Sequence, residues 1–151
     1  MNIVEQVNKL HDLAMACSES ATVWKVQRDV LRYERALYEA LAFEEQAISL
    51  IEQDPNPDAE LSCAILRRSA ASIAIECEEY ERAEQQIAHV LMSSSPPFVK
   101  DEVLDLVRAL PRDRRRAFRL QLRNGACVQR SAPRHITSQA SPPVPVCQPA
   151  F

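Results

Sequence analysis

Glycine is almost missing from this chain, which has a single one, Gly125, among 151 residues. Tight β-hairpin turns, dinucleotide-binding turns and phosphate-binding loops all use glycine where φ is positive or where the backbone approaches a phosphate. Aromatic residues are also few, at 5%. The composition therefore argues against hairpin-rich β folds and against nucleotide sites built on glycine loops.

Long apolar runs are missing as well, since no stretch of 18 consecutive apolar residues is present. The first twenty residues carry Glu5, His11 and Asp12 inside their apolar pattern and lack a basic start, so they do not resemble a signal peptide. The five cysteines form no CxxC pair. In a chain that is not exported, they are expected to be free thiols. These features predict a cytoplasmic protein, and its general character suggests a bacterial one.

No catalytic or metal-binding motif is present. The three histidines, His11, His89 and His135, lie far apart, and none belongs to an HExxH motif or lies at ligand spacing from a cysteine. The chain has no GxSxG element and no phosphate loop. We therefore predict a non-catalytic protein with no metal and no cofactor.

Adjacent carboxylates occur twice, at Glu44-Glu45 and at Glu78-Glu79. Neighbouring residues on a helix diverge by about 100°, so neither pair forms a carboxylate dyad by itself. Glu34, Tyr38 and Glu45 fall on one face of a predicted helix, where solvated charges are the usual explanation. Spacing along the chain leaves open whether such groups meet across helices.

Good helix formers dominate the first 110 residues and predict an all-α protein. Apolar residues at helical spacing are interrupted at 27–29, 54–57, 77–79, 93–97 and Pro111. Ser18, Ser20 and Thr22 weaken the first helix, so a break near 18–22 is one option. We predict a helical domain over 1–111, a basic segment with a short helix over 112–124, and a disordered tail over 125–151.

The stretch from Asp58 to Met92 is predicted to be two helices joined by a turn at 77–79. It resembles a tetratricopeptide repeat, on the positions Ala71, Tyr80, Ala83, Ile87 and Val90. It departs from that pattern at Arg67, Ala74 and Ser95. The resemblance implies a right-handed array of antiparallel helical hairpins, with about five helices and a C-terminal capping helix. The alternative is an ordinary antiparallel helix pair.

A weaker second repeat is placed on the first helix pair in one of two registers. Without gaps, Ala21 and Trp24 take the positions of Ala71 and Ala74, and Tyr33 takes that of Ala83. The competing register aligns the identical words at 33–36 and 80–83, and it moves the turn. We favour the ungapped register.

The resemblance also implies a concave groove that holds a peptide or a helix of a partner protein. On the central hairpin its positions are Ile65, Arg68, Ser72, Ile75 and Glu76, and on the first pair they are Met15, Ser18, Thr22, Lys25 and Val26. Lys25 and Arg68 are the residues expected to hold a carboxylate of the bound segment.

Charge is divided unevenly along the chain. Residues 1–113 hold 21 acids and 11 bases, a net charge of 11 − 21 = −10, whereas residues 114–151 hold seven arginines and no acid. The basic segment contains Arg114, Arg115, Arg116, Arg119 and Arg123. These arginines either bind an acidic surface, nucleic acid or anionic lipid, or they dock on the chain's own acidic domain or stay solvated, and we favour the second reading.

Taken together, the sequence predicts an adaptor that binds another protein or a peptide segment. One alternative is a structural homo-oligomer. Another is a nucleic-acid-associated factor that acts through the arginines, although no stacking aromatics or nucleic-acid motif accompany them. We expect neither nucleic acid nor a membrane as the principal partner.

Overall fold

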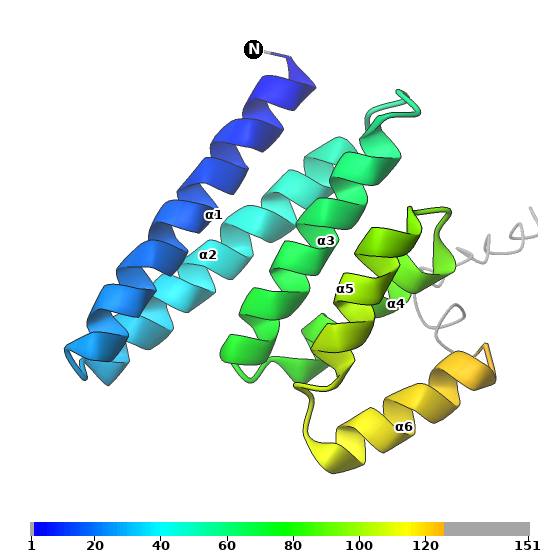
Figure 1. Cartoon of the computed structure of the whole chain (residues 1–151). Helices are drawn as coiled ribbons and strands as arrows, with labels where there is room; N and C mark the ends of the chain where they lie inside the picture. The colour runs from blue at the N-terminus through cyan, green and yellow to red at the C-terminus, as the bar shows by residue number, and fades with distance from the viewer. Residues whose placement is uncertain (1, 126–151) are drawn as a thin grey trace, which may run out of the picture.

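The computed structural model describes residues 2–125, and these residues form six α-helices without a strand. The helices are α1 (Ile3–Val26), α2 (Val30–Ile51), α3 (Ala59–Glu76), α4 (Tyr80–Met92), α5 (Pro97–Val107) and α6 (Arg112–Arg123). Figure 1 shows α1 and α2 as one long antiparallel hairpin, with the other helices beside it. The all-α prediction is confirmed. The predicted tail, apart from Gly125, lies outside the described residues.

Helix boundaries follow local signals in the sequence. Asn2 and Glu5 form a reciprocal capping box at the start of α1, and the Asp29 side chain accepts a hydrogen bond from the Arg32 N–H at 3.1 Å. Helix α5 begins at the end of the interruption predicted over 93–97, with Pro97 as its first residue. Gly125, with φ of 65°, follows the end of α6 in the left-handed conformation that glycine adopts without strain.

The break considered near residues 18–22 does not occur, because α1 is continuous to Val26. The Ser20 hydroxyl donates to the Ala16 carbonyl at 3.0 Å, and the Thr22 hydroxyl donates to the Ser18 carbonyl at 3.2 Å. These hydroxyls therefore bond back onto the preceding turn of the helix instead of competing with it. Packing of α1 against α2 along its length supplies the stability that helix propensity lacks.

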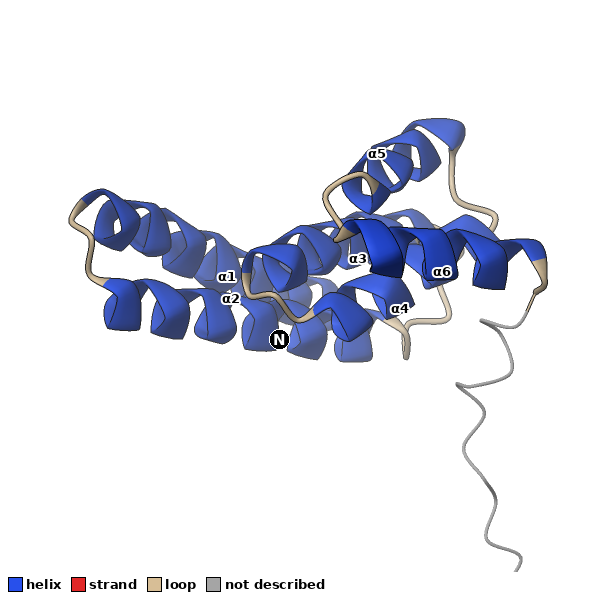
Figure 2. Cartoon of the chain, turned by 90° about the horizontal axis from the view of Figure 1, so that it is seen from below, coloured by secondary structure: helices blue, strands red, loops and turns tan. Residues whose placement is uncertain are grey.

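Consecutive helices pack on one another, so that α2 contacts both α1 and α3, and α5 lies against α3 and α4. Seen from below in Figure 2, α1, α3 and α5 lie above α2 and α4. The core is rich in alanines exposed by no more than 1%, which let the helices approach closely: Ala14, Ala21, Ala40, Ala47, Ala70, Ala71, Ala74 and Ala83.

The two hairpin turns share one geometry. Arg28 and Glu78 both have φ of 59°, and each lies between two antiparallel helices. The Asp29 N–H donates to the Trp24 carbonyl at 2.9 Å, and the Glu79 N–H donates to the Ala74 carbonyl at 2.8 Å. Each residue of the first turn corresponds to the residue 50 positions later in the second turn, as the ungapped register requires. The competing register would move this turn into α2.

The last two helices complete the main core. From α5, Val99 and Val103 are fully buried, and Phe118 of α6 is only 1% exposed. These side chains join the core formed by α3 and α4, and Leu122 packs against it. The basic segment predicted over 112–124 is thus a helix that shares the core of the preceding domain.

Arg67 occupies a core position where the tetratricopeptide pattern usually has a bulky apolar residue, and it is only 9% exposed. Its guanidinium forms an ion pair with Glu52 at the end of α2 and donates to the Gln86 side-chain oxygen of α4 at 2.7 Å. The aliphatic part of the side chain therefore fills space in the core while the charged end is bonded to two neighbouring segments. No helix of the described residues is long and apolar enough to cross a membrane.

Candidate functional site

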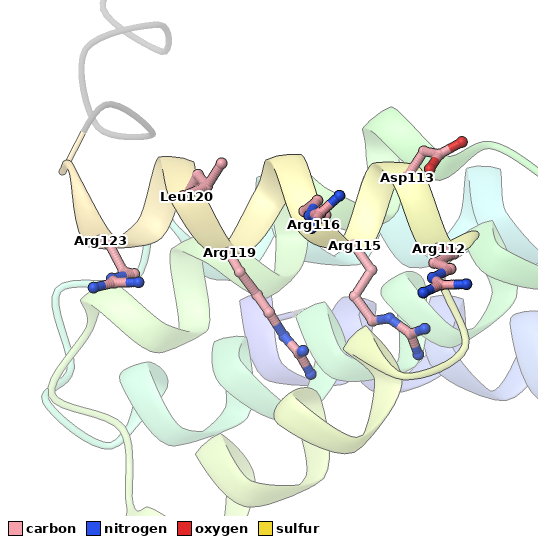
Figure 3. A pocket seen from close by; sticks show the side chains of 7 residues that line it. All are labelled: Arg112, Asp113, Arg115, Arg116, Arg119, Leu120 and Arg123. Carbon is pink, nitrogen blue, oxygen red and sulfur yellow. The ribbon is translucent and has the colours of Figure 1, made fainter.

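The most strongly charged surface lies on α6. Five arginines line one side of this helix and a shallow pocket of about 370 Å³ beside it, together with Asp113 and Leu120. We call these five the arginine row: Arg112, Arg115, Arg116, Arg119 and Arg123. Figure 3 shows Arg115 and Arg119 pointing to the same side of α6, with Arg112 and Arg123 near the two ends of the helix.

Helical spacing explains why the arginines gather on one face. At 100° per residue, Arg112, Arg116, Arg119 and Arg123 fall within a sector of about 60°. The buried Phe118 points about 120° away from the centre of this sector, so the core holds α6 with the row turned outward. Arg115 lies about 40° outside the sector, on the side nearer to Phe118, and it is half-buried.

Within residues 2–125, the arginine row has no acidic partner. Among residues 2–125, no carboxylate lies within ion-pair distance of any member of the row. The one side-chain hydrogen bond that the row makes within residues 2–125 runs from Arg115 Nη1 to the Arg108 carbonyl oxygen at 3.2 Å. Within the described part of the chain, the row is therefore a concentrated positive surface without a paired carboxylate.

Arg114 behaves differently, because it points to the other side of α6. Its Nε and Nη2 atoms donate to the two carboxylate oxygens of Glu84 at 2.9 and 3.2 Å, and its guanidinium lies 5.9 Å from the centre of the Tyr80 ring. Both partners belong to α4. Of the five arginines predicted as a basic binding segment, Arg114 thus docks on the chain's own acidic domain, and Arg115, Arg116, Arg119 and Arg123 do not.

A second notable surface is the end of the α1–α2 hairpin. Four large apolar side chains around this turn are exposed by 50% or more, and we call them the hairpin tip: Val23 at 50%, Val26 at 80%, Val30 at 61% and Leu31 at 80%. Beside them, the Arg32 guanidinium lies 4.7 Å from the Trp24 ring centre, and Lys25 Nζ lies 5.7 Å from that of Tyr33. The tip is thus apolar at its surface and bordered by cations.

The predicted groove residues fall into two groups. Thr22, Lys25 and Val26 lie on the last turns of α1 and are exposed, next to or within the hairpin tip. The second group lies on α3, where Ile65 is 40% exposed, Ser72 and Ile75 are half-buried, and Glu76 is exposed. Since α2 contacts both α1 and α3, the two groups belong to helices that are separated by a third. Met15 and Ser18, also predicted for the groove, are half-buried.

Arg68, expected to hold a partner's carboxylate, already has one inside the chain. Its Nε atom lies 2.7 Å from Glu102 Oε2 of α5, and both side chains are nearly half exposed. A partner carboxylate at this position would have to displace Glu102. An exposed pair of this kind contributes little to stability, so the exchange is energetically small.

A buried polar contact that sequence reasoning missed joins three helices. Glu44 of α2 is fully buried, its Oε1 atom lies 2.8 Å from His11 Nδ1 of α1, and it accepts a hydrogen bond from the Ser69 hydroxyl of α3 at 2.6 Å. Burial raises the pKa of the Glu44 carboxyl, while the bonds to Ser69 and His11 act in the opposite direction. Oε2 of Glu44 is buried without a hydrogen-bond partner.

The position of Glu44 on its helix is the sequence signal that could have predicted its burial. It lies three residues after Leu41 and four before Ile48, both of which are buried, so it occupies the apolar stripe of α2. The neighbouring Glu45 forms an ion pair with Arg82 of α4, and the Tyr38 hydroxyl donates to Glu79 at 3.0 Å. Glu34 is exposed, as a solvated helical charge is expected to be.

The contact among His11, Glu44 and Ser69 is not a catalytic triad. In a triad the histidine lies between the nucleophile and the acid, whereas here Ser69 and His11 both contact the same oxygen of Glu44. Within residues 2–125, no group of three metal-ligating side chains is present. The arrangement therefore serves to join α1, α2 and α3.

Three cysteines lie among the described residues, and all are free and half-buried: Cys17, Cys63 and Cys77. Burial raises the pKa of each thiol, in Cys77 to about 11 even though Arg82 acts to lower it. A thiol with a raised pKa is a poor nucleophile at neutral pH. These three cysteines are free thiols, as predicted, and their surroundings are those of small packing residues.

Comparisons of the chain with protein-family models, with curated proteins and with solved structures found no match.

Proposed function

We propose that this chain is a non-catalytic protein-interaction module of tetratricopeptide-like type, which binds a partner protein through the hairpin tip. The exposure of Val23, Val26, Val30 and Leu31 is the observation that carries the proposal. Scattered exposed apolar side chains are normal, but four of them around one turn, bordered by charged residues, are typical of a protein-binding surface. A partner that buries this tip removes its apolar area from water.

The spacing of α3 and α5 supports the tetratricopeptide-like part of the proposal. Glu60 of α3 accepts a hydrogen bond from the Ser94 backbone N–H at 3.2 Å, and Arg68 of α3 forms an ion pair with Glu102 of α5. In both contacts the partners are 34 positions apart, which is the length of a tetratricopeptide repeat. The turns of the first two hairpins are instead 50 positions apart, because α1 and α2 are longer than the helices of a tetratricopeptide repeat usually are.

The hairpin tip supports partner binding better than the predicted groove does. In the groove, Arg68 is paired with Glu102, and the groove residues of α1 and α3 lie on helices separated by α2. At the tip, Val26 and Leu31 are each 80% exposed and are held by two regular helices. The tip thus needs no rearrangement before it contacts a partner.

The experiment is affinity capture from a lysate of the source organism with three full-length baits. They are the unchanged protein, the tip variant Val26→Asp/Leu31→Asp, and a control, Leu13→Asp/Leu61→Asp, in which two less exposed apolar residues elsewhere receive the same charges. A partner of the tip is retained by the unchanged and control baits and is lost from the tip variant. Equal capture by all three baits would contradict binding through the tip.

Self-association is the second candidate, because the same tip on two copies is an apolar surface of matching chemistry. Sedimentation of the purified protein separates the two functions. A dimer that forms in the unchanged protein and is lost in Val26→Asp/Leu31→Asp would show that the tip serves self-association and not adaptor binding. A monomer at all concentrations leaves the tip to another protein. A cytoplasmic location and a bacterial origin remain predictions from the sequence.

A further inference from the structure

We propose that the arginine row is a second binding surface, which takes an acidic α-helix of a partner protein. Its helix, α6, and the turn between α1 and α2 lie at opposite ends of the molecule in Figures 1 and 2. The chain would then join two partners, one at each end. The inference does not depend on the tip binding its own partner.

The protein itself shows one contact between an arginine of α6 and a carboxylate on another helix. On its docked side, α6 packs against α4 with the bidentate pair between Arg114 and Glu84, and the buried Phe118 lies on the same helix. Bidentate arginine–carboxylate pairs are among the stronger side-chain contacts, because two parallel hydrogen bonds carry the charge attraction. The outer side of α6 offers the same group five times.

The spacing of the row fits a helical ligand. From Arg112 to Arg123 the row extends over about 16 Å of helix, and Arg112, Arg116, Arg119 and Arg123 follow one another at intervals of three or four residues. A partner helix with carboxylates three and four residues apart repeats with the same rise and can lie alongside α6. Leu120, which is 53% exposed and borders the row, adds an apolar contact that an amphipathic helix would cover.

A nucleic-acid duplex fits this surface less well. Its phosphates continue past both ends of a row that extends over about 16 Å, and they offer no apolar group to Leu120. The segment at 126–151 cannot supply the ligand either, since its sequence contains two arginines and no acid.

The test measures binding of the full-length protein to three fluorescent ligands by anisotropy. The first is an alanine-based helical peptide of about 16 residues with glutamates at i, i+4, i+7 and i+11 and one leucine beside them. The second has the same composition with the glutamates spread around the helix, and the third is a short DNA duplex. The first peptide is expected to bind at least about fivefold more tightly than the second. Equal binding of both peptides, or tighter binding of the duplex, would overturn the proposal.

Charge reversal then locates the site. Arg116→Glu/Arg119→Glu is expected to weaken peptide binding by roughly tenfold or more, because two attractive pairs become repulsive. Lys9→Glu/Arg35→Glu makes the same change in net charge on α1 and α2, and it is expected to change binding by less than about twofold. Equal losses in the two variants would mean that only net charge matters, which would overturn the proposal.

Two further measurements keep the result unambiguous. Circular dichroism and thermal melting show whether each variant is folded. If Arg116→Glu/Arg119→Glu is not folded, the milder variant Arg112→Gln/Arg123→Gln at the ends of the row is measured in its place. It is also expected to weaken peptide binding. The tip variant Val26→Asp/Leu31→Asp is expected to bind the peptide unchanged. A dimer that only the row variant abolishes would assign the row to a second copy and overturn the proposal.

Discussion

The two hairpins of this protein have the same turn geometry, but they differ in the helices that pack around them. Arg28 and Glu78 hold the same left-handed conformation, and the backbone bonds around them correspond one to one. Around the second hairpin, α5 and α6 add apolar side chains to the core, whereas the end of the first hairpin keeps four apolar side chains largely exposed. The hairpins therefore differ in what covers them more than in how they fold locally.

The core clusters reflect this difference. The larger cluster extends from Val7 of α1 through α2, α3 and α4 to Phe118 of α6. A small separate cluster near the first turn contains Ala21, Ala36 and Leu37 as its buried members. A region with few buried apolar contacts opens more readily than the main core. The first hairpin thus combines lower local stability with the more exposed apolar surface.

The largest effect on stability is expected from a substitution that undocks α6, which covers the second hairpin. Phe118→Ala is expected to lower the free energy of unfolding by about 3–5 kcal/mol, because the ring is 1% exposed and its loss leaves a cavity. Urea denaturation monitored by circular dichroism measures this. The control is Leu120→Ala on the same helix, which is 53% exposed and should cost less than about 0.5 kcal/mol. A cost below about 1 kcal/mol for Phe118→Ala would mean that α6 is not docked in solution.

The contact that joins the two hairpins should give a pH-dependent effect of intermediate size. Burial raises the pKa of Glu44 above its value in the unfolded chain, so between these two values the folded protein binds more protons. Stability that is present below the unfolded pKa is therefore lost as pH rises through the folded pKa. Glu44→Gln removes this pH-dependent loss of stability. The amide oxygen of the glutamine can still accept the hydrogen bond from the Ser69 hydroxyl.

We expect the stability of Glu44→Gln relative to the unchanged protein to grow from pH 4 to pH 8, by on the order of 1 kcal/mol. Urea denaturation at several pH values provides the measurement. Glu34→Gln, at an exposed position of the same helix, is the control and should follow the unchanged protein. If the Glu44→Gln curve also runs parallel to that of the unchanged protein, the proposed effect of burial on Glu44 is wrong.

The smallest effect tests whether the two turns are equivalent. Arg28→Gly and Glu78→Gly should each stabilise the protein by about 0.5–1 kcal/mol, because glycine adopts a positive φ without strain. Thermal melting of the two variants and of the double variant measures the gains, which should add. Gln27→Gly, at a φ of −77°, should instead destabilise. Gains that differ widely between the two hairpins would contradict the equivalence of the turns.

The helices and turns could be predicted from the sequence because their signals are local. Alanine, leucine and glutamate at helical spacing, the prolines after residues 54 and 95, and the capping Asp29 all act within a few residues. Five of the six arginines of α6 were also predicted as a group, and Arg112 was not among them. Their division into a docked Arg114 and an outward-facing row could not be read from net charge, since it depends on where Phe118 meets the core.

What only the tertiary structure decided is which charged groups are buried and what they contact. Glu44 meets a histidine 33 positions before it and a serine 25 positions after it, and Arg67 bridges segments of α2 and α4. Both lie on apolar stripes of their helices, so the sequence contained their positions but not their partners. Helix formation depends on neighbours along the chain, whereas the partner of a buried charge depends on how separate helices pack against each other.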